Sequence, residues 1–227
     1  MENNKRKSME QVIYEDLKNA ILNRVIAPGT QLVENIIAEK LKISRTPIRG
    51  ALRRLASEGF VNIITNKGAF VIQPSIEKVI QVYEVRRELE IIAMKFGIDK
   101  INKQDIDRLR ELVKEELKSY LEKDIERYLC INKEFHMMLA NKSNNQFLIE
   151  FTEKIIDQSN AYLIFYDVLF YGHMKETRGL NEHKEIINLI EQKNIKMLEE
   201  AFKKHIKGTM ESLKVNKRTY KSLSEIF

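Results

Sequence analysis

The sequence predicts a mainly α-helical protein, in which a small N-terminal domain of helices and one β-hairpin precedes an all-helical bundle. Eight glycines and three prolines among 227 residues are few for a turn-rich β fold. Apolar residues recur at helical spacing along most of the chain, and short β-forming runs stand out at residues 61–72. The pattern breaks at Gln73-Pro74-Ser75, so we place the two domains at residues 1–74 and 75–227.

Charge is divided unevenly between these domains. Residues 1–74 hold 12 Lys/Arg and 7 Asp/Glu, and residues 75–227 hold 27 and 26, so nearly all of the net charge of +6 belongs to the first domain. Such a distribution is expected if that domain alone contacts a polyanion.

The single Cys130 is expected to be buried in a reducing compartment. A polar N-terminus and the lack of any stretch near the roughly 18 apolar residues of a membrane span predict a cytoplasmic protein with no membrane partner.

Three helices are predicted before the hairpin. The first begins at Ser8, which opens a capping-box pattern, and the second follows the Pro28-Gly29 break and spans residues 32–40. A short turn joins the second helix to the third, which gives a helix-turn-helix arrangement whose second member enters the DNA major groove. We expect three apolar side chains of the second helix to point inward: Ile36, Ile37 and Leu41.

The third helix, residues 44–59, has two faces of different chemistry. Ser44 suits the N-cap and Gly59 can end the helix. Apolar residues recur on the face that should meet the core: Ile48, Leu52 and Leu55. Arginines recur every four residues on another face, with Thr46 beside them: Arg45, Arg49 and Arg53. Residues 40–54 contain no acidic residue, so this face suits a nucleic-acid groove, and the alternative is a solvated basic surface.

Two β-forming runs flank the turn Asn66-Lys67-Gly68 and predict a small hairpin, or wing, with Lys67 at its tip. Beyond the domain break the pattern predicts an all-helical bundle. Its helices are expected at residues 75–100, 104–120, 122–142, 145–170, 181–192 and 194–216.

All four histidines lie in the second domain, and three have suggestive positions. Asn132 and His136 are one turn apart on one helix. His183 begins a helix and His205 lies late in the next, so an antiparallel pair can bring them level. Three imidazoles and one oxygen donor would suit Zn, Ni or Mn, but a histidine on an amphipathic helix is more often a structural residue. The fourth, His173, lies in a predicted loop.

Several separated motifs occur in order in the first domain: Pro28-Gly29-Thr30-Gln31-Leu32, Ile37-Ala38-Glu39-Lys40-Leu41, Ser44-Arg45-Thr46-Pro47-Ile48-Arg49, Ala51-Leu52-Arg53-Arg54-Leu55, Glu58-Gly59 and Asn66-Lys67-Gly68-Ala69-Phe70-Val71. Through them the region 9–72 resembles the winged helix-turn-helix of the GntR family of bacterial transcription regulators. The resemblance implies that the operator is contacted by Arg45, Thr46 and Arg49, and that Gly68 lets the wing backbone approach the minor groove. Gly50 departs from the Glu that is usual in the family, and Asn35 replaces a basic residue of some relatives.

A second set of motifs follows: Tyr83-Glu84-Val85-Arg86-Arg87-Glu88-Leu89-Glu90, Phe135-His136, Asn144-Asn145-Gln146-Phe147-Leu148, Glu182-His183 with Ile186, and His205-Ile206. Residues 76–214 thereby resemble FCD, the FadR-type C-terminal ligand-binding domain of this family. Many members bind a divalent metal through an Asp and three histidines, and the Asp position is Asn132 here, which implies a lower metal affinity or a changed preference. Arg86 resembles the arginine that holds a carboxylate effector, and the alternative is an ordinary surface arginine.

Together these observations predict a homodimeric repressor or activator that places two recognition helices in successive major grooves of a pseudo-palindromic operator, under the control of a small carboxylate effector. Two alternatives remain: a metal-dependent helical-bundle enzyme, and a dimerising interaction module with structural histidines. No general base is evident beside the histidines, so we do not expect an enzyme. The predicted DNA-binding residues are Arg45, Thr46, Arg49, Arg53, Lys67 and Gly68, and the predicted metal ligands are Asn132, His136, His183 and His205.

Overall fold

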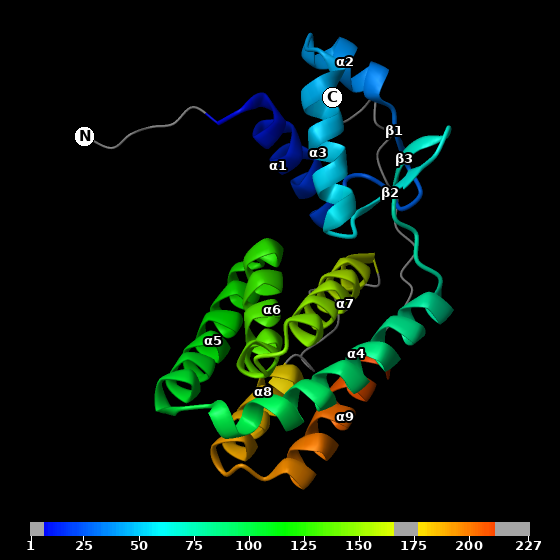
Figure 1. Cartoon of the computed structure of the whole chain (residues 1–227). Helices are drawn as coiled ribbons and strands as arrows, with labels where there is room; N and C mark the ends of the chain where they lie inside the picture. The colour runs from blue at the N-terminus through cyan, green and yellow to red at the C-terminus, as the bar shows by residue number, and fades with distance from the viewer. Residues whose placement is uncertain (1–6, 166–176, 212–227) are drawn as a thin grey trace, which may run out of the picture. The chain divides into compact units, whose positions relative to one another are not determined.

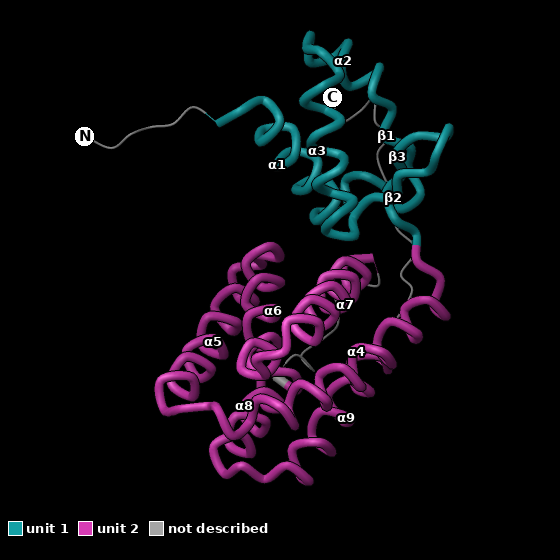
Figure 2. The backbone as a smooth tube through the Cα atoms, viewed as in Figure 1, with its two compact units in different colours: residues 1–73, 217–227 teal, residues 74–216 magenta. Residues whose placement is uncertain are grey.

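The protein, seen in a computed structural model that describes residues 7–165 and 177–211, consists of two compact units, and along the described chain the boundary lies between Gln73 and Pro74 (Figure 2). The described part of the first unit has three helices and three short strands, and that of the second has six α-helices and one 3-10 turn (Figure 1). The predicted fold class is therefore confirmed. Neither described range contains a helix long and apolar enough to cross a membrane.

The first unit is built on α1 (Met9–Leu22), α2 (Glu34–Leu41) and α3 (Arg45–Ser57). The three apolar residues predicted for the inner face of α3 are all buried. For α2 the prediction was partly wrong, because Ile37 is buried whereas Ile36 and Leu41 are 40% and 37% exposed. This two-turn helix has a single buried side, which packs on α3.

The predicted caps of these helices differ in outcome. Ser8 Oγ accepts a hydrogen bond from the Gln11 backbone N–H at 3.2 Å and so caps α1. Ser44 occupies the predicted N-cap position of α3 with the extended backbone of an N-cap residue, but its side chain makes no capping hydrogen bond. Gly59 follows α3 with φ of +79°, a left-handed conformation that glycine adopts without Cβ strain and that ends the helix.

The predicted wing is a hairpin of β2 (Val61–Ile64) and β3 (Gly68–Val71), and a third strand extends it. That strand, β1 (Gln31–Leu32), pairs antiparallel with β3 and gives the order β1-β3-β2. The sequence placed residue 32 in the second helix, whereas Leu32 lies opposite Ala69 with its side chain buried. The backbone N–H and C=O groups of β1 form hydrogen bonds with β3, whereas in a helix they would bond to residues nearby in the sequence.

The second unit contains α4 (Ile76–Gly97), α5 (Lys103–Glu122), α6 (Ile125–Lys142), α7 (Gln146–Phe165), α8 (Thr177–Glu191) and α9 (Ile195–Glu211), with the 3-10 turn Ile98–Lys100 after α4. These bounds follow the predicted ones closely, except that α8 begins before the predicted residue 181. The predicted helical residues 166–170 and 212–216 lie outside the described ranges, as does His173. Cys130 on α6 is exposed, so its predicted burial was wrong.

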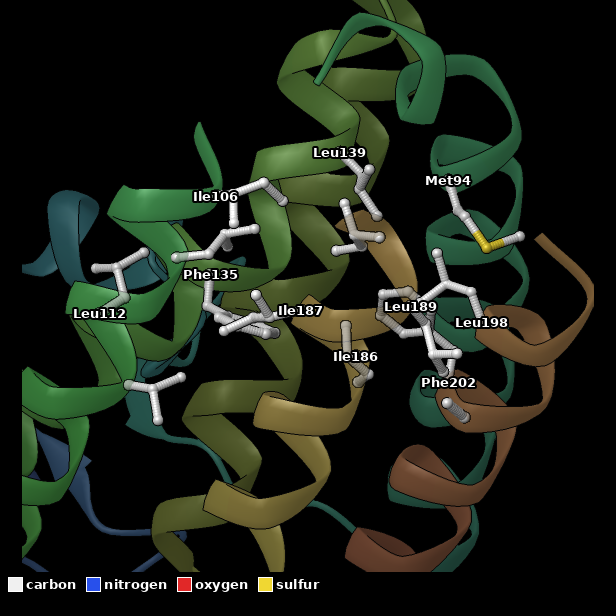
Figure 3. Packing of buried hydrophobic residues seen from close by; sticks show 14 of the residues in the cluster. Met94, Ile106, Leu112, Phe135, Leu139, Ile186, Ile187, Leu189, Leu198 and Phe202 are labelled. Carbon is white, nitrogen blue, oxygen red and sulfur yellow. The ribbon is translucent and has the colours of Figure 1, made fainter. Parts of the chain in front are cut away.

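The helices of this unit pack around a continuous apolar core. α4 lies against α6, α7 and α9, while α5 lies against α6 and α8 (Figure 1). Figure 3 shows that side chains from α4, α5, α6, α8 and α9 meet in one cluster, among them Met94, Leu112, Phe135, Ile187 and Phe202. α4 and α6 approach closely at Gly97, where a Cβ atom would overlap the backbone carbonyl oxygen of Leu139. The packing fixes α6, α8 and α9 relative to one another, and these are the helices that carry the histidines.

Candidate functional site

The outer face of α3 presents the four residues that the sequence assigned to DNA contact. The side chains of Arg45, Thr46, Arg49 and Arg53 are all exposed, while the apolar face of the same helix is buried in the first unit. The helix therefore offers a row of guanidinium groups with a hydroxyl beside it, which can donate hydrogen bonds to phosphates and to base edges.

The start of α2 orients two of these arginines. Arg49 Nε donates to Glu34 Oε2 at 2.8 Å, and Arg45 Nη1 donates to Asn35 Oδ1 at 3.4 Å. Arg53 makes no hydrogen bond or ion pair with any described residue. Because exposed ion pairs contribute only about 0–1 kcal/mol, a phosphate or a base can replace Glu34 as the partner of Arg49.

The wing presents the other two predicted DNA contacts. The side chains of Lys67 and Gln31 are exposed, and Gln31 Nε2 donates to the Lys67 carbonyl oxygen at 2.8 Å, which ties the wing tip to β1. Gly68 has φ of +96° at the start of β3, where a residue with a Cβ atom would be strained. The wing tip is thus a turn in which both Lys67 and Gly68 are exposed.

The three histidines of the predicted metal site converge inside the second unit. His136 on α6, His183 on α8 and His205 on α9 are all buried, and their candidate ligand atoms lie within 4.8 Å of one another. The ring centroid of His136 lies 5.3 Å from that of His183 and 5.3 Å from that of His205. The centroids of His183 and His205 are 4.7 Å apart. The predicted level pairing of α8 and α9 is what brings the last two together.

Each of these imidazoles is held by a different glutamate through Nδ1. The distances are 2.5 Å from His136 to Glu90 on α4, 2.7 Å from His183 to Glu116 on α5 and 2.9 Å from His205 to Glu182 on α8. When a neutral imidazole donates its Nδ1–H to a carboxylate, its lone pair is on Nε2. The Nε2 atoms of His136 and His183 are buried and have no hydrogen-bond partner among the described residues.

Burial sets the charge state of this cluster. It lowers the pKa of His136 to about 3, against the opposing influence of Glu90, so this imidazole is neutral near pH 7. Burial also lowers the pKa of His205, although the hydrogen bond to Glu182 opposes the shift. Burial alone would raise the pKa of Glu90, but its interactions with His136 and Arg86, including a hydrogen bond from each, outweigh burial and lower that pKa to about 2. Histidine binds Zn, Ni or Mn through the lone pair of a neutral ring nitrogen, and three ring nitrogens converge here with carboxylates behind them, so the residues present fit a divalent metal.

Asn132, the predicted fourth ligand, is buried on α6 one turn before His136. Its Nδ2 donates to Asn160 Oδ1 on α7 at 3.1 Å, and Asn160 Nδ2 donates to the Leu129 carbonyl oxygen at 3.4 Å. This pairing orients the amide of Asn132 and leaves its carbonyl oxygen without a hydrogen bond from a described residue. A neutral oxygen donor therefore stands where a carboxylate would add a negative charge.

Arg86, the predicted effector ligand, is 2% exposed, so the alternative of an ordinary surface arginine was wrong. Its Nε donates to Glu90 Oε1 at 2.6 Å and its Nη1 donates to Ser159 Oγ on α7 at 2.9 Å. Glu90 thus bridges Arg86 and His136 through its two oxygens. The candidate effector residue and one candidate metal ligand therefore share a single buried carboxylate.

Sequence reasoning missed the three glutamates and Asn160. The only local signals were that Glu90 follows Arg86 by one helical turn and that Glu182 precedes His183. A glutamate on a helix is usually exposed, and the role of Glu116 depends on a contact with a residue 67 positions away.

Two families match this chain. Residues 9–71 match the family described as bacterial regulatory proteins, gntR family, and residues 81–208 match the FCD domain. The chain is 28% identical over 197 residues to the HTH-type transcriptional regulator YdhC of Bacillus subtilis, covering 85% of this chain and 84% of that protein. It is 29% identical over 152 residues to the HTH-type transcriptional regulator McbR of Escherichia coli, covering 66% and 68%.

Solved structures share the fold. The structure of E. coli McbR/YncC matches with a TM-score of 0.71 and 20% identity, covering 92% of this chain and 98% of that one. A GntR-type transcriptional regulator from Rhodococcus sp. RHA1 matches with a TM-score of 0.69 and 21% identity, covering 91% and 98%.

Proposed function

The chain belongs to the GntR family of bacterial regulatory proteins and carries an FCD domain, and on this basis we propose that it represses transcription as a homodimer bound to a pseudo-palindromic operator. It is a DNA-binding transcriptional regulator, and the family relationship argues against the alternative of a metal-dependent enzyme. The proposed place of action is the cytoplasm, where bacterial DNA is accessible. Residues 1–74 are the proposed DNA-binding domain and residues 75–227 the proposed effector and dimerisation domain.

The exposed arginine row of α3 is the observation that carries the DNA-binding mode. Arg45 and Arg49 are held at the N-terminal part of the helix by Asn35 and Glu34, where a recognition helix contacts base edges. Thr46 lies between them, and Arg53 extends the row toward a phosphate. Lys67 and Gly68 are placed at the wing tip, from which they would follow the minor groove.

Operator selection tests this proposal. Sequences retained from a random duplex pool should share two half-sites with two-fold symmetry, spaced by about one helical turn. Their affinity should fall steeply between low and moderate salt because several phosphates are neutralised. Recovery of a single half-site, or binding that does not change with salt, would contradict the proposed dimeric recognition.

The histidine cluster and Arg86 support the proposed effector site. His136, His183 and His205 would hold a divalent metal, and Asn132 would supply a neutral oxygen. A divalent cation held there would supply positive charge for a carboxylate, and the Arg86 guanidinium, which shares Glu90 with His136, would supply a second contact for it. An effector that binds the DNA-competent and DNA-incompetent forms with different affinity would then shift operator occupancy.

Metal analysis followed by an effector screen tests this second step. The purified protein, stripped by a chelator, should show a higher melting temperature on adding Zn, Ni or Mn, and small carboxylates should then release the operator in a mobility-shift assay. If none of the three metals changes the melting temperature, the histidines are structural, as in the alternative of a dimerising module.

A further inference from the structure

Two residues of the second unit are unfavourable for the helices that carry them, and they touch each other. Arg178 lies in the first turn of α8, where the positive end of the helix dipole disfavours a cation. Gly208 lies inside α9, where glycine stabilises a helix less than alanine does. A Cβ atom on Gly208 would overlap the guanidinium of Arg178. We call the space left by the missing side chain the Gly208 notch, and the guanidinium fills it.

The guanidinium in the notch binds the carboxylate that holds His205. Arg178 Nε donates to Glu182 Oε1 at 2.9 Å, one turn further along α8. The other carboxylate oxygen, Glu182 Oε2, lies 2.9 Å from His205 Nδ1 on α9. The side chains of Glu182 and His205 are 8% and 9% exposed, whereas that of Arg178 is 41% exposed. A chain of contacts therefore leads from solvent to one imidazole of the histidine cluster.

The same arrangement occurs at a second imidazole of the cluster. Arg86 and Glu90 are also one turn apart, Arg86 Nε donates to one carboxylate oxygen, and the other oxygen contacts His136 Nδ1. Arg86 is fixed further by a hydrogen bond from Nη1 to Ser159 Oγ. Arg178 makes no second hydrogen bond with a described residue, so the notch in α9 takes the place of that contact.

We propose that Arg178 is a positioning residue for the metal site and that the Gly208 notch seats it, an inference that rests on the metal site of the proposed function. The last torsion of a glutamate side chain is soft, so a carboxylate that loses one of its two donors can turn. His205 would then lose the fixed acceptor for its Nδ1–H. Such outer partners set the tautomer and the direction of a metal-binding imidazole, so Arg178 acts on His205 through Glu182.

Charge alone does not explain an arginine at this position. A guanidinium beside a site for a divalent cation repels that cation, and solvent screens this repulsion because the side chain of Arg178 is 41% exposed. The favourable contribution of Arg178 is therefore geometric. The two effects are separable, because moving the guanidinium off Glu182 leaves its charge on the chain.

Gly208→Ala tests the notch in the full chain. The added methyl group displaces a guanidinium at the end of a flexible side chain, so the backbone of α9 can stay in place. Affinity for Zn²⁺, Ni²⁺ or Mn²⁺, whichever binds the wild type most tightly, should fall about tenfold in competition with a chromogenic chelator. The melting temperature of the chelator-stripped protein should stay the same or rise, because alanine favours the helix. A residue that only supported packing would instead lower this temperature and leave the affinity unchanged.

Gly179→Ala is the matched control, since it makes the same change beside Arg178 on α8 and its Cβ meets nothing within 4 Å. This variant should keep the wild-type metal affinity. In an Arg178→Ala background, Gly208→Ala should have no further effect on affinity, because no guanidinium remains to be displaced. A loss of about tenfold in that background would show that the methyl group acts on α9 directly, and it would overturn the proposal.

The outcomes separate this inference from the proposed metal site. If Gly208→Ala binds the metal as tightly as the wild type, Arg178 does not position His205, while the metal site itself still stands. If the wild-type protein binds none of the three metals in the same competition, the metal site and the role of Arg178 are both wrong.

Discussion

Nδ1 of His136 on α6 lies 2.5 Å from a carboxylate oxygen of Glu90 on α4, although the two residues are 46 positions apart in the sequence. The other oxygen of Glu90 accepts a hydrogen bond from Arg86 at 2.6 Å. One buried carboxylate therefore connects the proposed effector ligand to a proposed metal ligand. A carboxylate effector that bound Arg86 would compete with Glu90 for the same guanidinium, and this contact would then link the proposed effector site to the proposed metal ligand His136.

His183→Ala should abolish the rise in melting temperature on adding Zn, Ni or Mn, because it removes one of three converging imidazoles. Operator affinity of the metal-free protein should stay within a few-fold of the wild type, as measured by mobility shift. His173→Ala, which changes the fourth histidine, is the control and should keep the metal response. A retained response in His183→Ala would remove this residue from the site.

Glu116→Gln should weaken metal binding by about 10–100-fold while leaving all three imidazoles in place, since the charged acceptor of the His183 Nδ1–H proton is lost. Competition with a chromogenic chelator measures the change. Glu115→Gln is a matched control on the same helix, because that side chain pairs with Arg108 instead. Equal metal affinity in both variants would show that the carboxylate does not support the site.

Glu90→Gln should lower the free energy of unfolding of the second unit by about 3–5 kcal/mol, because the Arg86 charge would stay buried without its partner. Urea denaturation followed by circular dichroism measures this loss. Glu84→Gln on the exposed side of α4 is the control and should leave stability unchanged. A stability like that of the control would mean that Arg86 finds another partner or moves into solvent.

Arg49→Ala should weaken operator binding by about 1–3 kcal/mol and relax the sequence preference at one position of each half-site. Arg54→Ala is the control on the same helix, because Arg54 donates to Gln11 and lies 3.6 Å from the Tyr14 ring centroid, toward α1. The affinities of both variants are measured for the selected operator and for operators with single-base changes. Unchanged affinity in Arg49→Ala would exclude base or phosphate contact by this residue.

Gly97→Ala should destabilise the second unit by about 1–3 kcal/mol, because the added Cβ meets the Leu139 backbone and forces α4 away from α6. Gly179→Ala on α8 is the control, since a Cβ there meets nothing within 4 Å and alanine favours the helix. Thermal unfolding should therefore shift in opposite directions for the two variants. A Gly97→Ala protein as stable as the wild type would show that the α4–α6 contact can relax.

Local patterns predicted the recognition helix and the wing. The three arginines of α3 and its buried leucines follow from helical periodicity alone, and the turn at Gly68 follows from the conformational freedom of glycine. The strand at Leu32 was not predictable in this way, because its pairing partner Ala69 is distant in the sequence.

By itself, the sequence determined the order of the helices, the charge of the α3 face and the presence of three histidines at helical positions that could meet. Only the tertiary structure decided that Glu90, Glu116 and Glu182 each hold one imidazole and that Arg86 is buried. The physical reason is that periodicity reports which face of a helix is apolar, whereas a buried polar contact depends on how separate helices pack.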